Sequence, residues 1–375
     1  MDRSGAMWCG PGMRYIPPHL LLLAVLTLLT ACSRAAVTGV TALSAEGAIV
    51  QPVFIATQRS KDQLGPAFGA RREEDLRFGR LDVSIPPGHK PGNLERVSGV
   101  ADPAKVFTPV GVENYATVAQ FVSAVRRNRA GDGGAVIFVP GYNNTLEDGA
   151  FRLAQVKQDF EINEPAILFS WLSAGDARGY VYDRDSVLFA RDGFEELLRE
   201  LDARGQKNIL IVAHSMGGYL TMETLRQIAI KGDHRILDAL EGVILMSPDI
   251  DPDVFRQQAK AIGDLPEPFL ILTSRKDHIL SLAGLLTGMK PRLGRIDSAE
   301  AVAGLDVTVL DLTELSAGEG AGHNVPFASG KAIKVLRGID QQIRKDGGSM
   351  KNFVLQGRDR APGLGEALFG VRILQ

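Results

Sequence analysis

Short apolar runs alternate with amphipathic segments along most of this chain, and glycine, proline and polar turns separate them. Continuous apolar runs predict buried strands, which are 53–57, 80–85, 135–139, 166–170, 209–212, 242–246, 269–273 and, as the last one, 307–312. Apolar positions at helical spacing predict helices, which are 118–125, 145–160, 194–201, 219–230 and 332–343. Strands that alternate with helices favour a mostly parallel sheet with helices covering both faces.

The domain organisation follows from the same pattern. Residues 50–345 read as one α/β domain, because neither an internal repeat nor a domain-splitting linker interrupts them. Residues 32–49 are mostly small and polar and are predicted to be a tether. The tail, 346–375, is Gly-rich and then apolar, and no role is assigned to it.

The amino-terminal segment has the pattern of a secretion signal. Arg3 and Arg14 precede an apolar stretch, 20–29, that is too short to span a bilayer comfortably. The stretch ends in Leu-Thr-Ala-Cys32, which resembles the lipobox of bacterial lipoproteins. The resemblance implies removal of residues 1–31 and lipid attachment at Cys32, with an ordinary signal peptide or a membrane anchor as the alternatives. Residue 33 is Ser rather than Asp, so the familiar signal that retains a lipoprotein in the inner membrane is absent. This favours a location at the outer membrane, facing the periplasm. Met13 is an alternative start of the chain.

Composition narrows the function classes. The chain has 375 residues, 45% of them hydrophobic, and a net charge of −2, so no nucleic-acid partner is indicated. Of its two cysteines, Cys9 lies in the predicted signal, so no intrachain disulfide is expected in the mature protein. Neither a Walker loop nor an H-E-x-x-H motif is present, and no cofactor or metal is expected.

Residues 208–218, Asn-Ile-Leu-Ile-Val-Ala-His-Ser-Met-Gly-Gly, predict a strand, a sharp turn and a helix with Ser215 at the turn. A serine becomes a useful nucleophile when the backbone presents it and a base activates it. The segment resembles the nucleophile elbow G-x-S-x-G of the α/β-hydrolases, with Ala213 at the position of the first glycine. Strand and helix pass closely in such an elbow, so Ala213 and Gly217 must be small. The resemblance covers residues 50–345 and implies the α/β-hydrolase fold and a serine hydrolase.

The family order places a histidine after the last strand, where Gly-Ala-Gly-His323 stands. We therefore predict that His323 is the base. The other histidines fit this role less well: His19 is in the signal, His89 is expected in an exposed loop, and His234 is expected on a solvated surface. The side chain of His214 is expected to leave the elbow in another direction.

The orienting acid is predicted to be Asp277, which follows the strand at 269–273. Asp249, after the preceding strand, is the alternative acid. His278 is a weaker rival to His323, because Asp277 cannot readily orient its own neighbour in sequence.

An oxyanion hole requires two N–H donors. The resemblance assigns one to the backbone of Met216, directly after the nucleophile. The other is expected in Pro-Gly-Tyr-Asn-Asn (140–144), where Tyr142 is the first candidate and Asn143 the second.

The function expected from these residues is hydrolysis of a small-molecule or lipid-like carboxylic ester through an acyl-enzyme on Ser215. A serine amidase or peptidase acting on envelope components, and a non-catalytic envelope binding protein that keeps the fold, are the alternatives. Residues 279–304 are longer than a plain connection and are expected to form either a cap that binds an acyl chain or an ordinary core helix.

Overall fold

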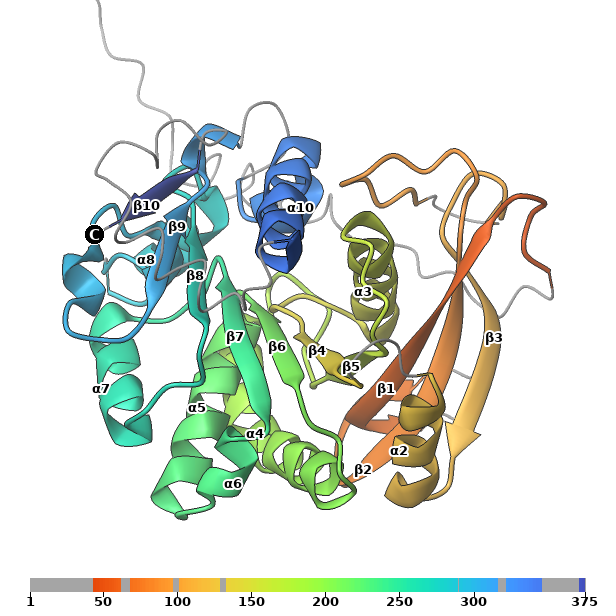
Figure 1. Cartoon of the computed structure of the whole chain (residues 1–375), viewed down its shortest axis with the longest axis horizontal. Helices are drawn as coiled ribbons and strands as arrows, with labels where there is room; N and C mark the ends of the chain where they lie inside the picture. Colours follow the sequence, from red (N-terminus) through yellow and green to blue (C-terminus); the bar gives the residue numbers. More distant parts are fainter. Residues whose placement is uncertain are drawn as a thin grey trace, which may run out of the picture. The chain divides into compact units, whose positions relative to one another are not determined.

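The computed structural model describes residues 43–61, 68–96, 101–128, 133–288, 290–315, 322–345 and 371–374. Within these ranges the strands form a single sheet with the order β10-β9-β8-β7-β6-β4-β5-β1-β2-β3 (Figure 1). The strands are β1 (Ile49–Lys61), β2 (Phe68–Ile85), β3 (Thr108–Tyr115), β4 (Ala135–Val139), β5 (Ala166–Ser170), β6 (Ile209–His214), β7 (Leu240–Met246), β8 (Phe269–Thr273), β9 (Thr308–Asp311) and β10 (Arg372–Leu374).

The helices between them are α2 (Val118–Arg127), α3 (Leu146–Asp159), α4 (Tyr180–Ala203), α5 (Met216–Ile230), α6 (His234–Leu237), α7 (Pro252–Ile262), α8 (His278–Leu286), α9 (Val325–Ala328) and α10 (Gly330–Lys345). Short 3₁₀ turns, η2 (Leu293–Arg295), η3 (Ala299–Val302) and η4 (Thr313–Leu315), lie in the later connections. Thr145 and Asp148 form a capping box at the start of α3.

The centre of the sheet is parallel, as predicted. Strands β1, β5, β4, β6, β7, β8 and β9 pair in parallel with their neighbours. The sheet is extended by antiparallel strands at both ends, β2 and β3 beyond β1, and β10 beyond β9. This is the α/β-hydrolase fold, and the prediction of a mostly parallel sheet with helices on both faces is confirmed.

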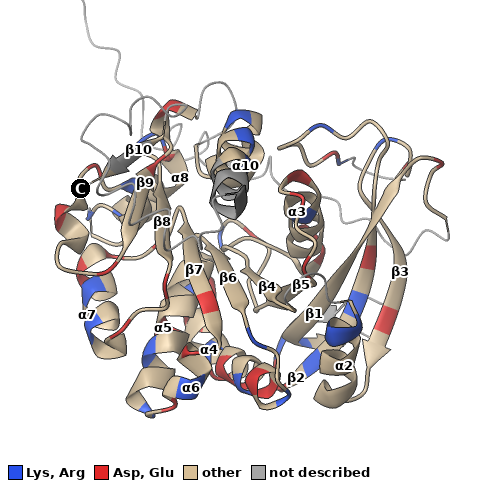
Figure 2. Cartoon of the chain, viewed as in Figure 1, with Lys and Arg blue, Asp and Glu red and all other residues tan. Residues whose placement is uncertain are grey.

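Alternation along β6 shows how both faces are covered. Ile209, Ile211 and Ala213 pack into a core shared with α2, α4, α5 and α7. Leu210 and Val212 point to the other face, where α3, α9 and α10 pack. In Figure 1 the first group of helices lies along the lower side of the sheet and α3 and α10 lie above it. Figure 2 shows charged residues on the helices, on β7 and on outer strands such as β2 and β3, whereas β4, β5, β6 and β8 carry none.

Among the helices, α4 begins at Tyr180, well before the predicted 194, and α7 was not predicted. The strands differ from the sequence prediction in three ways. Strands β1 and β2 extend well beyond the predicted 53–57 and 80–85, because the buried centre of each continues as a long antiparallel hairpin. Strand β3 was not predicted; it contains Pro109 and Gly111 and ends in polar residues, so its apolar pattern is weak. The prediction that 307–312 is the last strand was wrong: Leu374 in β10 pairs with Val309 in β9, so part of the predicted tail belongs to the sheet. Residues 346–370 lie outside the described residues.

Candidate active site

The predicted elbow lies between β6 and α5. Ser215 has φ 53° and ψ −121°, a conformation that non-glycine residues adopt at a strain cost of about 1–3 kcal/mol. The backbone is held on both sides, because Ser215 N donates to Met246 O (2.9 Å) and Asp249 N donates to Ser215 O (3.1 Å). A Cβ atom on Gly217 would collide with the carbonyl oxygens of Val139 and Pro140. The expected close passage of strand and helix is therefore present, and Gly217 cannot be larger.

The structure brings His323 and Asp277 together. His323 Nδ1 lies 2.7 Å from Asp277 Oδ2, and the Asp277 side chain is fully buried. Asp277 is also the N-cap of α8, where its Oδ1 accepts the Leu280 N–H at 2.9 Å. Gly322 (φ 75°) packs so closely on Lys276 and Asp277 that a Cβ would overlap the Lys276 carbonyl. Two loops that are 46 residues apart in sequence are thus fixed against each other by one glycine and one carboxylate.

The His323 ring also contacts the residue that precedes Ser215. The His214 and His323 rings lie 4.6 Å apart, and His214 Nε2 lies 3.3 Å from the His323 carbonyl oxygen. Burial and the neighbouring His323 lower the pKa of His214 well below its ordinary value. His214 is therefore neutral, and its Nε2–H donates to the carbonyl. The sequence analysis predicted that the His214 side chain leaves the elbow in another direction, and it did not predict the contact with His323.

Among the described residues, His323 Nε2 has no hydrogen-bond partner, and no hydrogen bond joins it to Ser215 Oγ. Such bonds are often long in unliganded enzymes and tighten when substrate is bound. The ring nitrogen that a base would use is thus left available beside the elbow.

The two candidate donors of the oxyanion hole come from the start of α5 and from the loop after β4. Met216 is the first residue of α5, and its N–H has no partner inside that helix. In the loop after β4, Asn143 N donates to Asp183 Oδ2 (3.2 Å), which excludes the second candidate. The Tyr142 N–H donates to no acceptor in the described part of the chain, so Tyr142 stays the predicted second donor. A Cβ on Gly141 would lie 2.9 Å from Ser215 Cβ, so this loop lies directly against Ser215.

A buried arginine that the sequence analysis missed supports this loop. The Nη2 atom of Arg59, in β1, donates to the carbonyl oxygens of Asn144 (3.1 Å), Trp171 (2.9 Å) and Ser173 (3.0 Å). Burial lowers the pKa of Arg59 to about 10, although nearby Asp183 opposes the shift, so the side chain is still charged at neutral pH. The Trp171 indole N–H donates to Pro140 O at 2.7 Å. The sequence offered no clear signal, because Arg59 follows the apolar run 53–57 within the polar stretch Thr-Gln-Arg-Ser-Lys.

Asp249, the alternative acid, does not contact His323. Its Oδ1 lies 2.7 Å from Arg292 Nε, and its Oδ2 accepts the Tyr180 hydroxyl at 2.9 Å. The carboxylate that faces His323 is that of Asp277.

The remaining histidines divide into two kinds. His234 and His278 are exposed, as predicted for His234. The expectation of an exposed His89 was wrong: its side chain is only 9% exposed and lies 2.8 Å from both Glu95 Oε2 and Asp159 Oδ1. These partners are 6 and 70 residues away, so the loop position alone did not reveal them.

Helix α8 lies in the segment that was predicted to be either a cap or a core helix, and it has one buried and one exposed apolar side. Leu280 and Ala283 are buried, whereas Leu282, Leu285 and Leu286 are 57%, 59% and 64% exposed. An apolar surface therefore begins directly after Asp277.

The predicted signal, Met13 and Cys32 lie outside the described residues. Within the described ranges, no helix is long and apolar enough to cross a membrane. The same ranges contain no cluster of His, Cys, Asp or Glu side chains suited to a metal ion.

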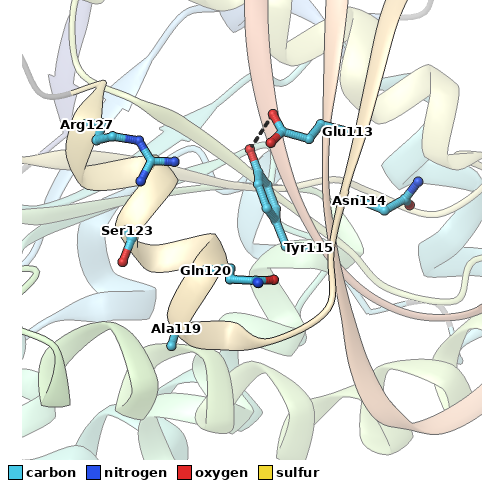
Figure 3. A pocket seen from close by; sticks show the side chains of 7 residues that line it. All are labelled: Glu113, Asn114, Tyr115, Ala119, Gln120, Ser123 and Arg127. Atoms are coloured by element: carbon cyan, nitrogen blue, oxygen red, sulfur yellow. Dashed lines mark hydrogen bonds between the residues drawn. The ribbon is translucent and has the colours of Figure 1, made fainter.

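A hollow of about 570 Å³ lies elsewhere, between the edge strand β3 and helix α2 (Figure 3). Its polar wall includes Glu113, Tyr115, Gln120 and Arg127, and Tyr115 donates to Glu113 at 3.1 Å. None of the predicted site residues lines it.

Comparisons with known proteins agree with the fold. The family described as "Alpha/beta hydrolase of unknown function (DUF900)" matches residues 116–342, more than half of the chain. The chain belongs to this family and is an α/β hydrolase. No curated protein matches.

Solved structures with a similar fold are distant. A dienelactone hydrolase from Anabaena variabilis is 11% identical (TM-score 0.37) over 74% of this chain and 94% of its own. A predicted CIB-like hydrolase from Thermoplasma acidophilum is 16% identical (TM-score 0.35) over 78% and 100%, respectively. A thermophilic esterase from Thermogutta terrifontis is 14% identical (TM-score 0.35) over 72% and 89%.

Proposed function

We propose that this α/β hydrolase is a serine esterase in which Ser215 is the nucleophile, His323 the base and Asp277 the orienting acid. The observation that carries the proposal is the pairing of His323 Nδ1 with Asp277 at 2.7 Å, with the His323 ring in contact with His214, directly before a serine held at φ 53°. Asp277 can accept the Nδ1–H and fix the ring, so that Nε2 is the nitrogen that takes up a proton.

The chemistry follows in two steps. Ser215 Oγ attacks the ester carbonyl carbon as its proton passes to His323 Nε2, and the carbonyl π electrons move to the oxygen. The N–H groups of Met216 and Tyr142 stabilise this oxyanion, which collapses and expels the alcohol as His323 returns the proton. Water, deprotonated by His323, then attacks the acyl-enzyme and releases the acid and Ser215.

An apolar acyl chain is the substrate part that the surroundings favour. Leu282, Leu285 and Leu286 are exposed on α8, the helix that Asp277 caps. Burying such apolar side chains against an acyl chain is favourable, because it removes apolar surface from water. We therefore expect ester hydrolysis to become faster as the acyl chain lengthens.

A panel of p-nitrophenyl esters of increasing acyl length, with the matching p-nitroanilides, tests this activity. The proposal predicts turnover of the esters, little turnover of the anilides, and loss of both in Ser215→Ala. Faster turnover of anilides would instead support the amidase, and a folded protein without any turnover or active-serine labelling would support a binding protein.

We also propose that the enzyme is held at the cell envelope by lipid on Cys32. The support is the sequence pattern Leu-Thr-Ala-Cys32 after an apolar stretch. Mass analysis of the native amino terminus should find a diacylglyceryl-modified Cys32, and an unmodified Cys32 would rule out the anchor.

A further inference from the structure

A buried charged network lies beside the proposed site and takes no part in the chemistry described above. Arg292 Nε lies 2.7 Å from Asp249 Oδ1, and Arg292 Nη2 lies 3.1 Å from the Tyr180 hydroxyl oxygen. The Tyr180 hydroxyl donates to Asp249 Oδ2 at 2.9 Å. Exposed fractions are 3% for Arg292, 2% for Asp249 and 8% for Tyr180. Each member therefore contacts the other two away from solvent.

Stability alone is a weak reason for such a network. Removing two charges from water costs several kcal/mol per ion, and the attraction between them often does no more than offset this cost. Apolar residues of similar volume commonly stabilise a core equally well or better. A buried ion pair next to a candidate active site therefore calls for an explanation in terms of geometry.

An aromatic contact connects the network to residues 140–144, the loop with the predicted oxyanion donor Tyr142, called the oxyanion loop below. The Tyr180 ring lies edge-on to the Tyr142 ring, with centroids 5.5 Å apart and planes at 76°. The Tyr142 hydroxyl donates to Ala177 O at 3.4 Å, just before α4 begins. The position of Tyr180 thus limits where the Tyr142 side chain can lie, and with it the orientation of the Tyr142 N–H.

The network is connected to the nucleophile and the acid through the backbone. Asp249 N donates to Ser215 O (3.1 Å), so the residue that pairs with Arg292 also holds the elbow. Directly after Arg292, Leu293 N donates to Ile250 O (2.8 Å), and the Gly294 carbonyl accepts the Ser274 N–H (2.9 Å). Ser274 opens the loop that ends at Asp277. One buried network therefore joins the three loops that carry the oxyanion donor, the nucleophile and the acid.

We propose that Arg292, Asp249 and Tyr180 are positioning residues that hold the Tyr142 amide at the distance from Ser215 that the oxyanion requires. The inference rests on the proposed function. Tyr180 transmits the position of the Arg292–Asp249 pair to Tyr142, and the pair fixes Tyr180 through its hydroxyl.

Two variants of the full-length protein test this role. Tyr180→Phe removes one oxygen and leaves the Arg292–Asp249 pair intact, so that no buried charge loses its ionic partner. Arg292→Met with Asp249→Asn removes both charges together and avoids an unpaired ion. A misplacement of the order of 1 Å in such a site can reduce the rate about 100-fold. We expect kcat to fall about 3- to 10-fold in Tyr180→Phe and about 10- to 100-fold in the double variant, with KM changed less than about twofold.

A boronic acid inhibitor provides a readout that general loss of structure would not reproduce. Its tetrahedral serine adduct places an oxygen in the oxyanion hole, so its inhibition constant should rise by the same factor as kcat falls. Thermal unfolding of each variant establishes that it is folded at the assay temperature. The control is Arg80→Met with Asp82→Asn, which removes another ion pair (3.0 Å), in β2, together with the contact of Arg80 with the half-exposed Glu113 (3.1 Å), and should leave kcat and boronate inhibition unchanged.

The outcomes separate the two proposals. If the unmodified protein hydrolyses no ester, the proposed function fails. If it is active and the folded double variant keeps its kcat and boronate affinity, the positioning role alone is overturned. A rise in KM at constant kcat would equally overturn it, because Arg292 would then act on substrate binding.

Discussion

Two histidine–carboxylate assemblies in this protein have nearly the same geometry and opposite consequences. His323 Nδ1 lies 2.7 Å from Asp277, and His89 lies 2.8 Å from both Asp159 and Glu95. Both rings are largely buried. The difference is in the second nitrogen: both nitrogens of His89 are bound to carboxylates, whereas Nε2 of His323 has no partner among the described residues.

On the proposed function, this difference separates the base, His323, from a histidine that only links two segments, His89. A histidine held between two carboxylates is stabilised in its doubly protonated form and has no ring nitrogen available to accept a proton from a nucleophile. A histidine held at one nitrogen is oriented, and its other nitrogen can take up and return a proton. The neighbours agree, because His323 contacts His214, which directly precedes the strained Ser215, whereas His89 joins the loop at residues 86–96 to the end of α3.

The largest effect is expected when each assembly loses its carboxylate. Asp277→Asn keeps the volume but no longer holds the tautomer of His323 that activates Ser215, so kcat/KM should fall roughly 10³- to 10⁴-fold. Asp159→Asn is the matched change at His89 and should alter kcat/KM less than about threefold, because His89 has no part in the reaction. Steady-state kinetics with an aryl ester measures both, and equal losses in the two folded variants would remove the distinction.

A smaller effect is expected from the support of the oxyanion loop. Trp171→Phe removes the indole N–H that holds Pro140 O at 2.7 Å. The loop should lose part of its preorganisation, with a decrease in kcat of about tenfold at nearly constant KM. The same assay and the boronate inhibition constant check this, and an unchanged inhibition constant would show that Trp171 does not position the hole.

The assembly of His89 with Asp159 and Glu95 should instead contribute to the stability of the fold, and this contribution should depend on pH. Burial by itself lowers the pKa of His89, but the hydrogen bonds to Asp159 and Glu95 outweigh it and raise the pKa above its ordinary value. A pKa raised by folding contributes stability that is complete below the unfolded-state pKa, about 6.5, and is lost as pH rises through the folded-state pKa. His89→Gln should therefore destabilise the protein by about 1–3 kcal/mol near pH 6 and by less near pH 9.

Thermal unfolding of His89→Gln and the unmodified protein at both pH values provides the measurement. Ester hydrolysis by His89→Gln below its melting temperature should be unchanged. A destabilisation that grows with pH would contradict the assigned charge state of His89.

The smallest effect is expected at His234, which is exposed at the start of α6. His234→Ala should change stability by less than about 0.5 kcal/mol and leave kcat/KM unchanged. Chemical unfolding and the ester assay check this control, and a large loss of activity would show that His323 had been wrongly chosen among the histidines.

The sequence predicts the elbow, the proposed acid and base, and the parallel centre of the sheet, but for different reasons. The elbow is encoded by consecutive residues, since an apolar strand, two small flanking residues and a helix all lie within 208–230. The positions of Asp277 and His323 follow from family order along the chain. The parallel centre of the sheet is predictable for the same local reason, because each strand is a continuous apolar run.

The missed features depend on contacts between distant segments. Arg292 and Tyr180 are 112 residues apart, and Arg59 contacts carbonyls more than 80 residues away. Strand β10 is short and, among the described strands, pairs with β9 alone, so its place in the sheet depends on its partner and not on its own sequence pattern. His89 was assigned to solvent because its loop is rich in proline and glycine, while its partner Asp159 comes from α3.

The most direct test of the central claim is the site and rate of fluorophosphonate labelling of the intact protein. The account predicts one covalent adduct, located by peptide mass analysis on Ser215, which forms at an unchanged rate in His89→Gln, at least about 100-fold more slowly in His323→Ala, and not at all in Ser215→Ala. An adduct on another residue, or labelling that persists in folded Ser215→Ala, would contradict the assignment of Ser215 and His323.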